Sequence, residues 1–367
     1  MGRREGAVAA LGMSPASRPD PGFWAGKRVL LTGHSGFKGA WAALWLARMG
    51  ASVTGLSLAP DEQPSLFELA RIADRVDHRI ADLRDAVLVA TTLAGRPFDL
   101  VLHMAAQALV RESIRDPIAT FAINVMGTAH LLDALRERDA LRAVLVVTSD
   151  KVYANAETGR AFAEGDPLGG KDPYSASKAA AEIVTASFAR SYFAGKTPVA
   201  TARGGNVIGG GDFSRDRIMA DIVRAAMAGE ETVLRHPEAT RPWQHVLDCV
   251  AGYLVYAERL AIDPATPRAM NFGPRPDATI LTVGELATRA TGALGARPWR
   301  HEPDAASIEA RTLGIDTALA GRLLGFHSRL DAPEAVDWTV DWYRRWSDGD
   351  DPAALCDEQI SRYEDLQ

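Results

Sequence analysis

Residues 28–39 read RVLLTGHSGFKG, an apolar segment followed by three glycines at three-residue spacing. The segment Arg28–Leu31 is rich in branched apolar side chains, as in a buried parallel strand. Residues 40–49 read AWAALWLARM, a strong helix-forming run that stops at Gly50. A strand, a glycine turn and a helix in this order are the context in which dinucleotide-binding motifs occur.

Each glycine of this turn has its own physical role. Gly33 allows the tight turn, Gly36 lets a pyrophosphate approach the backbone, and Gly39 lets the helix pack closely on the strand. The helix N-terminus then offers free N–H groups and a partial positive charge to phosphates. The spacing is G-x-x-G-x-x-G rather than the G-x-G-x-x-G of most dehydrogenases, so a purely structural βα turn is the alternative interpretation.

Length and composition restrict the class of protein. The chain has 367 residues, of which 47% are hydrophobic and 24% charged, which is typical of a globular protein with one large or two smaller domains. The net charge of −6 argues against nucleic acid or an anionic membrane as a partner. The two cysteines, Cys249 and Cys356, form no disulfide framework, which fits a reducing cytoplasm. No apolar run approaches the roughly 18 residues of a membrane span, and no metal-spaced His/Cys cluster occurs.

Short apolar strands alternate with helices through the first half of the chain. Strands are predicted at 52–57, 98–103, 143–147 and 199–203, a further short strand ends within 80–85, and helices open at Asn124 and Tyr174. This alternation predicts an α/β fold with a Rossmann-type doubly wound parallel sheet. After it fades, a smaller mixed α/β C-terminal domain is predicted.

The predicted organisation has three parts. Residues 1–22 form a disordered extension rich in proline, 23–207 a cofactor-binding domain, and 208–367 the second domain, with part of 242–262 packing back on the first. Trp338, Trp342 and Trp346, spaced by four, indicate the core-facing side of a terminal helix.

Polar side chains follow the apolar strand 143–147. Ser149, Asp150 and Lys151 lie at its carboxyl end, which is where open α/β sheets place their chemistry; helix capping is the alternative. Tyr174 and Lys178 are four residues apart and share one face of a predicted helix. A nearby ammonium lowers the pKa of a phenol, so the pair is suited to proton transfer, although chance exposed pairs of this spacing are common.

The end of the second predicted strand bears on the choice of dinucleotide. Residues 58–61 read LAPD, so the acid that usually binds the adenosine ribose is missing or displaced to Asp61. No arginine is present there for a 2′-phosphate, which favours NAD over NADP. Asp82 is placed to meet the adenine edge, with a polar loop as the alternative.

Glycines and arginines mark the second half of the chain. Residues 204–212 read GGNVIGGGD, which indicates backbone lying close to a ligand or at a crossover between domains. The arginines considered as phosphate clamps, each of which is also a normal surface residue, are Arg203, Arg217, Arg241 and Arg311.

Taken together, these stretches resemble the extended short-chain dehydrogenases that act on nucleotide sugars, and among them the CDP-glucose 4,6-dehydratases. The resemblance covers residues 23–350 and is carried by TGHSGFKGAW from Thr32, PSLFE from Pro64, HMAAQ from His103, NVMGT from Asn124, TSDK from Thr148, DPYSASK from Asp172, GNVIGGGD from Gly205, RPWQHVL from Arg241 and NFGP from Asn271. The chain departs from the family at Ala59, where an acid is usual, and at Val152–Ala154, where Cys-Tyr-Asp is common.

The resemblance implies a reaction and a cofactor. NAD would stay tightly bound while CDP-glucose is converted to CDP-4-keto-6-deoxyglucose by internal hydride transfer from C4 to C6 with loss of water. It further implies a cytoplasmic enzyme of deoxysugar and lipopolysaccharide O-antigen biosynthesis, assembled as a homodimer or tetramer through the helices near Asn124 and Tyr174. The apolar residues considered for that interface are Leu131, Leu132, Leu135, Val184 and Phe188.

The resemblance also implies roles for individual residues. Tyr174 takes the C4 hydroxyl proton, Lys178 lowers its pKa and holds the nicotinamide ribose, Ser149 binds the C4 oxygen, Asp150 protonates the leaving C6 hydroxyl, and Lys151 is either the C5 base or a cation stabilising the C5 enolate. The expected cofactor contacts are Gly33, Ser35, Gly36, Phe37, Lys38, Gly39, Asp82, Leu83, Met104, Ala105, Ala106, Gln107, Asn124, Tyr174 and Lys178. The expected substrate contacts are Gln107, Asn206, Arg217, Arg241 and His245.

Two other functions stay open at this point. Another nucleotide-sugar 4,6-dehydratase or a 4-epimerase of the same family would share Ser149, Tyr174 and Lys178, but an epimerase needs no acid–base pair beside them. An NAD-sensing regulator would need the glycine turn but not the Tyr174/Lys178 pair.

Overall fold

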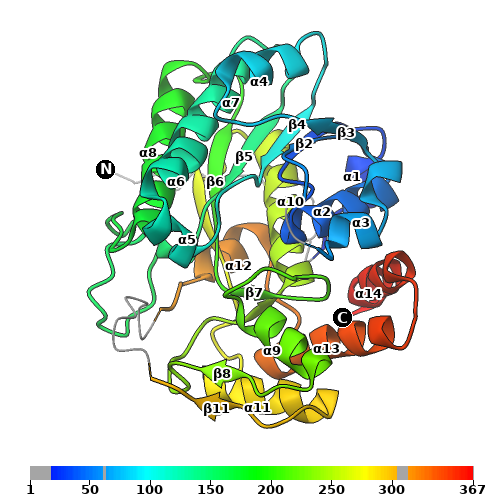
Figure 1. The fold of residues 1–367 in the computed structure, drawn as a ribbon. Helices are drawn as coiled ribbons and strands as arrows, with labels where there is room; N and C mark the ends of the chain where they lie inside the picture. Colours follow the sequence, from blue (N-terminus) through cyan, green and yellow to red (C-terminus); the bar gives the residue numbers. More distant parts are fainter. Residues whose placement is uncertain (1–17, 61–62, 304–312, 367) are drawn as a thin grey trace, which may run out of the picture.

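A seven-stranded parallel sheet forms the centre of the molecule (Figure 1). The computed structural model describes residues 18–60, 63–303 and 313–366. The strands of the sheet are β1 Arg28–Thr32, β2 Ser52–Ser57, β3 Asp77–Ile80, β4 Leu100–His103, β5 Ala143–Val147, β6 Val199–Gly204 and β10 Ala269–Phe272. Their spatial order is β10-β6-β5-β4-β1-β2-β3, so the order reverses between β1 and β4. This is the predicted doubly wound sheet, and the reversal is where such sheets bind ligands.

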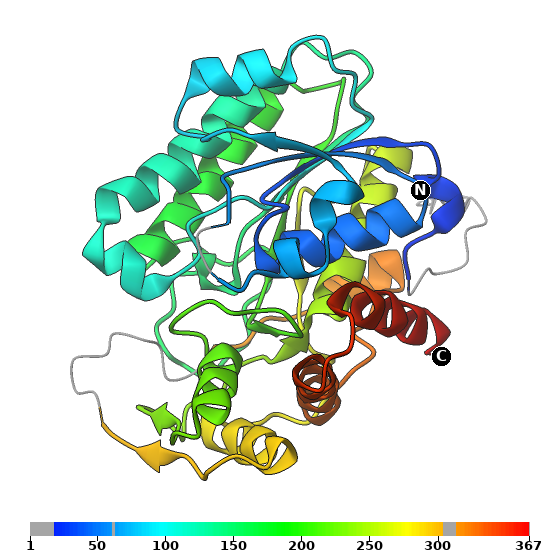
Figure 2. The same ribbon diagram turned by 45° about the vertical axis from the view of Figure 1, so that its right-hand side comes forward.

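Helices cover both faces of the sheet (Figures 1 and 2). On one face lie α4 Ala86–Leu93, α5 Val110–Arg115, α6 Pro117–Phe121, the π-helical turn η2 Ala122–Met126, α7 Gly127–Leu135 and α8 Pro173–Ser191. On the other face lie α2 Phe37–Arg48, α10 Val246–Ile262, α12 Ala318–Leu324 and α14 Pro352–Asp365, with α1 Pro21–Trp24, α3 Leu66–Leu69 and the 3₁₀ turn η1 Ile72–Asp74 at the edge. The strands are buried on both sides, which explains why β5 is wholly apolar.

A smaller second layer, built from the second half of the chain, lies beyond the carboxyl edge of the sheet (Figure 1). It contains α9 Ile218–Ala228, α11 Val283–Leu294, α13 Ala332–Ser347 and the short strands β7 Val207–Ile208, β8 Val233–Leu234, β9 Gln244–His245 and β11 Arg300–His301. Its own apolar cluster includes Ile222, Leu286 and Val336. Trp338 and Trp342 of α13 are buried, so the tryptophan spacing does mark a core-facing helix.

The sheet takes one more strand than the sequence predicts. β2 and β5 have the predicted bounds, but β10 comes from the segment assigned to the second domain and pairs with β6. Four residues without regular alternation around them carry too little pattern to predict a strand. The predicted return of residues 242–262 corresponds to α10, which packs on α2 and β5 beneath the sheet.

The N-terminal prediction needs correction where the structure describes it. Residues 1–17 lie outside the described residues, but Asp20 caps α1, donates its backbone N–H to Glu258 Oε1 at 2.9 Å, and is followed by a buried Trp24. Residues 18–22 are therefore ordered, because an Asp-Pro pair begins a short helix that packs on α10.

The continuous helical stretch Pro117–Leu135 is the one segment among the described residues with the length and mean hydropathy of a membrane span. No such segment was predicted from the apolar runs of the sequence. Its residues Leu131, Leu132 and Leu135 are completely buried against the sheet. These three leucines thus serve the core, whereas Ile118 and Met126 of the same stretch are exposed.

Candidate active site

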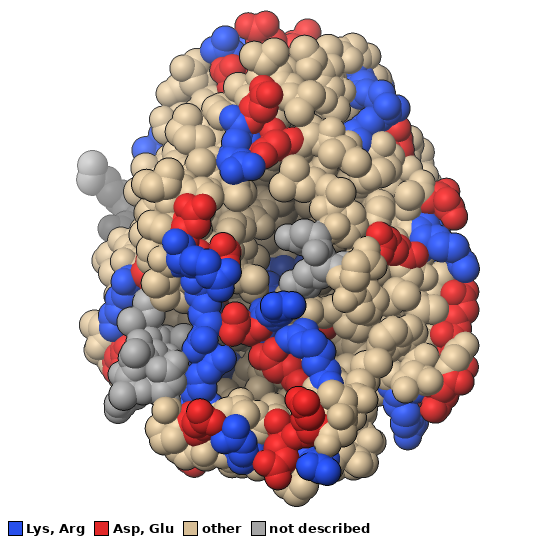
Figure 3. All heavy atoms as spheres, in the orientation of Figure 1, with Lys and Arg blue, Asp and Glu red and all other residues tan. Residues whose placement is uncertain are grey.

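A cavity of about 440 Å³ lies at the carboxyl ends of β1, β2 and β4, where the strand order reverses. The predicted cofactor residues that line it are Gly33, Ser35, Gly36, Phe37, Lys38, Gly39, Asp82, Leu83, Met104, Ala105, Ala106 and Gln107. On the side of the second layer, the cavity is bounded by residues 211–214 and Arg217. Figure 3 shows the molecule hollowed near the middle of this face, with Lys and Arg side chains beside the hollow.

The glycine turn forms a cradle that other residues would fill. Gly33 has a φ of +77°, and a Cβ there would lie 2.6 Å from the Ala105 nitrogen. A Cβ on Gly39 would lie 2.0 Å from the Gly33 oxygen, so α2 and β1 pack at backbone distance. A Cβ on Gly36 would meet only the Gly33 oxygen, at 3.4 Å, and would otherwise project into the cavity. A bare turn at the start of the twelve-residue helix α2 fits a diphosphate.

The far end of the cavity is apolar at the end of β2. Leu58, Ala59 and Pro60 line it, and Ser35 Oγ donates a hydrogen bond to Leu58 O at 2.9 Å. Asp82 lies on the other side with its carboxylate bound to Arg84, whose hydrogen bonds lower the pKa of Asp82. Asp61 lies outside the described residues.

Asn124 is placed differently from its expected role as a cofactor contact. It is buried outside the cavity lining, and its side chain accepts from Gln107 N at 2.9 Å and donates to Gln107 O at 3.0 Å. It also donates to Ser177 Oγ at 2.8 Å. Asn124 thus ties the loop after β4 to α8 and fixes the Gln107 backbone at the cavity wall.

The polar residues after β5 form a compact cluster. Ser149 Oγ donates to Asp150 Oδ1 at 3.0 Å, and Lys151 Nζ lies 3.6 Å from the same oxygen. Asp150 is buried, and its Oδ2 has no hydrogen-bond partner among the described residues. A buried carboxylate oxygen without a partner is costly, so its presence here indicates a functional role.

Tyr174 joins this cluster from α8. Burial raises the pKa of Tyr174, while the Lys151 cation and a hydrogen bond with Ser149 oppose that rise. Lys178 Nζ donates instead to Val147 O at 3.1 Å, and burial and then Lys38 lower the pKa of Lys178 to about 7. Among the charged neighbours that lower the pKa of Tyr174, Lys151 has the largest effect.

The cluster adjoins the cavity through two of its lining cations. Lys38 acts electrostatically on Lys178 and is itself influenced by Asp150, and Arg217 acts on Tyr174. Burial is the main cause of the lowered pKa of Lys38. A phenol, a carboxyl group and two lysine side chains thus lie beside a dinucleotide-sized groove, which suits acid–base chemistry coupled to hydride transfer.

The predicted substrate residues of the second half fall into two groups. Arg217 lines the cavity. Asn206 follows Gly205 in the chain and Arg241 precedes Pro242, and a Cβ on Gly205 would lie 3.1 Å from Pro242 Cγ and 3.5 Å from Asp150 Oδ2. Asn206 Oδ1 is buried without a hydrogen-bond partner in the described structure.

Two other predicted residues have structural positions. His245 is completely buried as the cap of α10, with Nδ1 accepting from Leu247 N, so its ring is closed off from the cavity. Arg203 is buried in an ion pair with Glu182 at 2.8 Å and is not a phosphate clamp. Arg311 lies outside the described residues. Whether an arginine or histidine is buried beside a carboxylate or under a helix depends on residues far away in the chain. A local sequence pattern therefore does not indicate it.

Several lining residues were not predicted as contacts. Residues 64–66 and 212–214 line the cavity, and so do Glu112 of α5 and Ile123 of η2. Residues 64–66 and Asp212 lie in motifs that carry the family resemblance, so a signal for them was present in the sequence. Of the glycines before Asp212, Gly210 lies against Trp342 of the second layer, and its oxygen accepts a hydrogen bond from Trp41 Nε1 of α2 at 3.0 Å. This glycine therefore lies where the chain crosses between the two parts of the molecule.

Within the described residues, no group of three or more His, Cys, Asp or Glu is arranged to hold a metal ion.

Comparisons with known proteins agree with this geometry. Residues 29–273 match the model of the NAD dependent epimerase/dehydratase family. A CDP-glucose 4,6-dehydratase of Salmonella typhimurium is 40% identical over 352 residues, which cover 94% of this chain and 98% of that protein. A dTDP-glucose 4,6-dehydratase of Xanthomonas campestris is 34% identical over 62% of this chain and 67% of its own. A solved UDP-glucose-4-epimerase of Stenotrophomonas maltophila, with bound NAD and formylated UDP-arabinopyranose, superposes with a TM-score of 0.76 at 26% identity over 88% of this chain and 100% of that one.

Proposed function

Because this chain belongs to the NAD-dependent epimerase/dehydratase family, we propose that it is an NAD-dependent enzyme that converts CDP-glucose to CDP-4-keto-6-deoxyglucose with loss of water. The observation that carries the proposal is the Asp150–Lys151 pair, 3.6 Å apart and next to Tyr174. Elimination of water across C5 and C6 needs an acid and either a base or a cation beside the sugar, whereas epimerisation at C4 does not. The Salmonella relative, similar over nearly its whole length, supports CDP-glucose as the substrate.

The residues would share the chemistry as follows. The Tyr174 side chain, as the phenolate, accepts the C4 hydroxyl proton and becomes the phenol, with Ser149 hydrogen-bonded to the same oxygen. Asp150, whose Oδ2 has no partner in the described structure, gives the proton that it holds as the carboxylic acid to the C6 hydroxyl, which leaves as water. Lys151 either takes the C5 proton as the neutral amine, or stays charged and stabilises the enolate that forms when water or Asp150 takes that proton.

The cradle around Gly33, Gly36 and Gly39 fits a dinucleotide, with Lys178 toward its nicotinamide ribose and Asp82 toward its adenosine. NAD, when bound there, supplies the hydride acceptor for C4 and the donor for C6, so it is regenerated in each turnover. Residues 211–214 of the second layer lie over the same cavity and would help to exclude water from the unsaturated intermediate.

The proposal is tested by incubating the purified protein with NAD and, in parallel, CDP-glucose, dTDP-glucose or GDP-mannose. We expect a product 18 mass units lighter than CDP-glucose, the mass of one water (about 18) lost by a dehydratase. A product of unchanged mass but altered C4 stereochemistry would favour the epimerase alternative. Turnover of dTDP-glucose in preference to CDP-glucose would support the proposed dehydration but contradict CDP-glucose as the substrate.

We expect NAD to bind at least about tenfold more tightly than NADP. Leu58, Ala59 and Pro60 at the end of β2 provide no cation for a 2′-phosphate, which NADP-binding proteins of this fold usually hold with an arginine. Calorimetry on the cofactor-free protein measures both affinities. The exposed position of Ala59 gives a matched variant: Ala59→Arg should reverse part of the preference, by about tenfold. Tighter NADP binding to the wild type would contradict the assignment.

A homodimer, a cytoplasmic location and a role in O-antigen deoxysugar synthesis complete the proposal. Of the residues predicted for the interface, Leu131, Leu132 and Leu135 are core residues, whereas Val184 and Phe188 of α8 are half-buried. Exposed apolar side chains on the same pair of helices are Ile118, 78% exposed on α6, and Ile183, 63% exposed on α8, whose helices are in contact. Such side chains on neighbouring helices favour a covered surface.

We expect the double variant Ile118→Asp/Ile183→Asp to sediment as a monomer at micromolar concentration, while the wild type sediments as a dimer. Burying two carboxylates at an apolar contact costs several kcal/mol, about enough to weaken association a thousandfold. Met227→Asp is the control, since Met227 is 61% exposed on α9 of the second layer. A monomeric wild type, or a dimeric double variant, would rule out this interface.

A further inference from the structure

Helix α8 carries three ionisable side chains at four-residue spacing, of which the proposed function uses two. Tyr174 and Lys178 belong to the catalytic cluster, and Glu182 follows one turn further along the same face. Glu182 is only 5% exposed. A carboxylate at that depth is strongly disfavoured unless its oxygens are paired and hydrogen-bonded.

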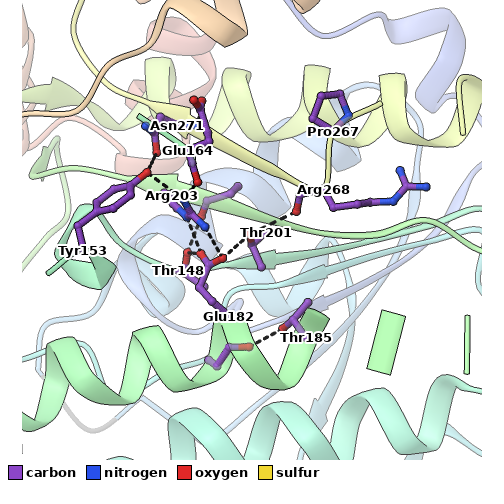
Figure 4. Close-up of polar contacts among 12 residues, drawn as sticks. Thr148, Tyr153, Glu164, Glu182, Thr185, Thr201, Arg203, Pro267, Arg268 and Asn271 are labelled. Atoms are coloured by element: carbon purple, nitrogen blue, oxygen red, sulfur yellow. Dashed lines mark hydrogen bonds and ion pairs between the residues drawn. The ribbon is translucent and has the colours of Figure 1, made fainter. Parts of the chain in front are cut away.

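The Glu182 carboxylate accepts four hydrogen bonds, all from the strand ends that face α8 (Figure 4). Oε1 accepts from Thr148 Oγ1 at 2.5 Å and from Arg203 Nε at 2.9 Å. Oε2 accepts from Thr201 Oγ1 at 2.7 Å and from Arg203 Nη2 at 2.8 Å. Thr148 directly follows β5, and the other two donors belong to β6, so one side chain fixes α8 to two strands.

Arg203 extends this network away from the chemistry. Its Nη1 donates to Tyr153 OH at 2.9 Å and to Glu164 O at 3.0 Å, and Tyr153 OH donates to Asn271 Oδ1 of β10 at 2.6 Å (Figure 4). This part of the network explains how β10 is held beside β6. It does not explain why the carboxylate also holds Thr148.

Two contacts connect α8 to the segment that carries the catalytic cluster, and Glu182 makes one of them. Thr148 is the residue before Ser149, so the hydroxyl that Glu182 accepts from belongs to the segment that carries the polar cluster. Lys178 Nζ donates to Val147 O, the residue before Thr148. Consecutive residues at the end of β5 are thus held by consecutive turns of α8, which fixes the register between helix and strand.

We propose that Glu182 is a positioning residue for the reaction, which holds the Ser149–Lys151 segment in register with α8 and supplies the negative charge that faces Lys178. The proposal rests on the proposed function, in which Lys178 binds the nicotinamide ribose and Ser149 the C4 oxygen.

The charges around Lys178 give the direction of the expected effect. Lys38 of α2 opposes its protonation and Glu182 favours it, while Arg203 lies beyond Glu182. His103 of β4 also faces it, but burial and then Lys178 lower the pKa of His103 to about 3, so that ring is neutral. Removing the charge of Glu182 leaves Arg203 uncompensated, so Lys178 loses its proton at lower pH.

The test is calorimetric titration of NAD into cofactor-free wild type and Glu182→Gln at a series of pH values from about 6 to 9. Affinity falls as pH rises through the pKa of Lys178, because only the ammonium donates all its hydrogen bonds to a ribose. We expect the midpoint of this fall to move to lower pH by about one unit in Glu182→Gln. Glu164→Gln is the matched control: its carboxylate accepts from Asn271 N in the same network but is not among the groups acting on Lys178, so its midpoint should stay in place.

A second variant separates register from charge and covers the case in which Glu182→Gln does not fold. Thr148→Val keeps the shape of the side chain and the Glu182–Arg203 pair but removes the hydrogen bond from the β5 end. We expect its kcat with CDP-glucose to fall by about tenfold with an unchanged pH midpoint for NAD. An unmoved midpoint in Glu182→Gln, or wild-type turnover in Thr148→Val, would overturn the proposal. A wild type that shows the NAD midpoint but does not consume CDP-glucose would instead overturn the proposed substrate.

Discussion

Replacing Tyr174 by phenylalanine is expected to lower kcat by about a thousandfold. The fold should be unchanged, and the affinity for NAD should stay within about threefold of wild type. The substitution removes only the phenol oxygen, which the proposed mechanism requires as the acceptor of the C4 hydroxyl proton. No buried donor is orphaned, because Ser149 Oγ still donates to Asp150 Oδ1 at 3.0 Å. Loss of turnover with retained binding would therefore report on chemistry rather than on stability.

The measurement is steady-state turnover of CDP-glucose together with calorimetric binding of NAD and of the sugar nucleotide. Tyr192→Phe is the control, since Tyr192 caps the other end of the same helix and is exposed. Residual activity of Tyr174→Phe within tenfold of wild type would remove Tyr174 from its assigned role.

Lys151→Ala is expected to stop the reaction one step later, at loss of the C5 proton. The Lys151 side chain lies beside Asp150 and acts on Tyr174, which places it near the proposed position of the sugar. It does not belong to the glycine cradle, so we expect NAD binding to be retained. We expect kcat to fall about a hundredfold or more, as for loss of a general base or of a charge aimed at an enolate. Substrate deuterated at C5 should then react several times more slowly than unlabelled substrate, about the size of a primary isotope effect, whereas deuterium at C4 should have little influence.

Two further variants sharpen this prediction. Lys171→Ala is the matched control, because Lys171 pairs with Glu157 on the surface of the loop before α8. Lys151→Arg keeps the cation but not a usable base, so substantial activity would identify Lys151 as a stabiliser and inactivity would identify it as the base. Normal turnover of Lys151→Ala, or a large isotope effect at C4 instead of C5, would show that the role given to this residue is wrong.

The local pattern of the sequence accounts for much of the fold and the cofactor cradle. β2 and β5 lie where the apolar segments predicted them, and the glycine turn between β1 and α2 has the close backbone contacts that its three glycines indicate. The predicted fold class and family were both confirmed, the latter by the family match over residues 29–273. These features depend on residues close together in the chain, so a local pattern contains the information.

Features that depend on distant partners were not predictable in the same way. Arg203 looks like a phosphate ligand until the fold places Glu182 against it, and Asn124 looks like a cofactor contact until its amide is found between Gln107 and Ser177. His245 and the strand β10 differ from expectation for the same reason, since burial is decided by segments far away in sequence.

We propose above all that one hydride passes from C4 to C6 of the same sugar by way of NAD while water is lost. Tyr174, Asp150 and Lys151 take part in the proton transfers. The most direct test uses an equal mixture of unlabelled CDP-glucose and CDP-glucose carrying deuterium at C4 and ¹³C throughout the sugar, with the wild-type protein and products analysed by mass spectrometry and NMR. The account predicts that deuterium appears at C6 only in the ¹³C-labelled 4-keto-6-deoxy product, with one solvent proton incorporated at C5. Deuterium that is lost to solvent, passes to the unlabelled product or returns to C4 of an epimer would contradict it.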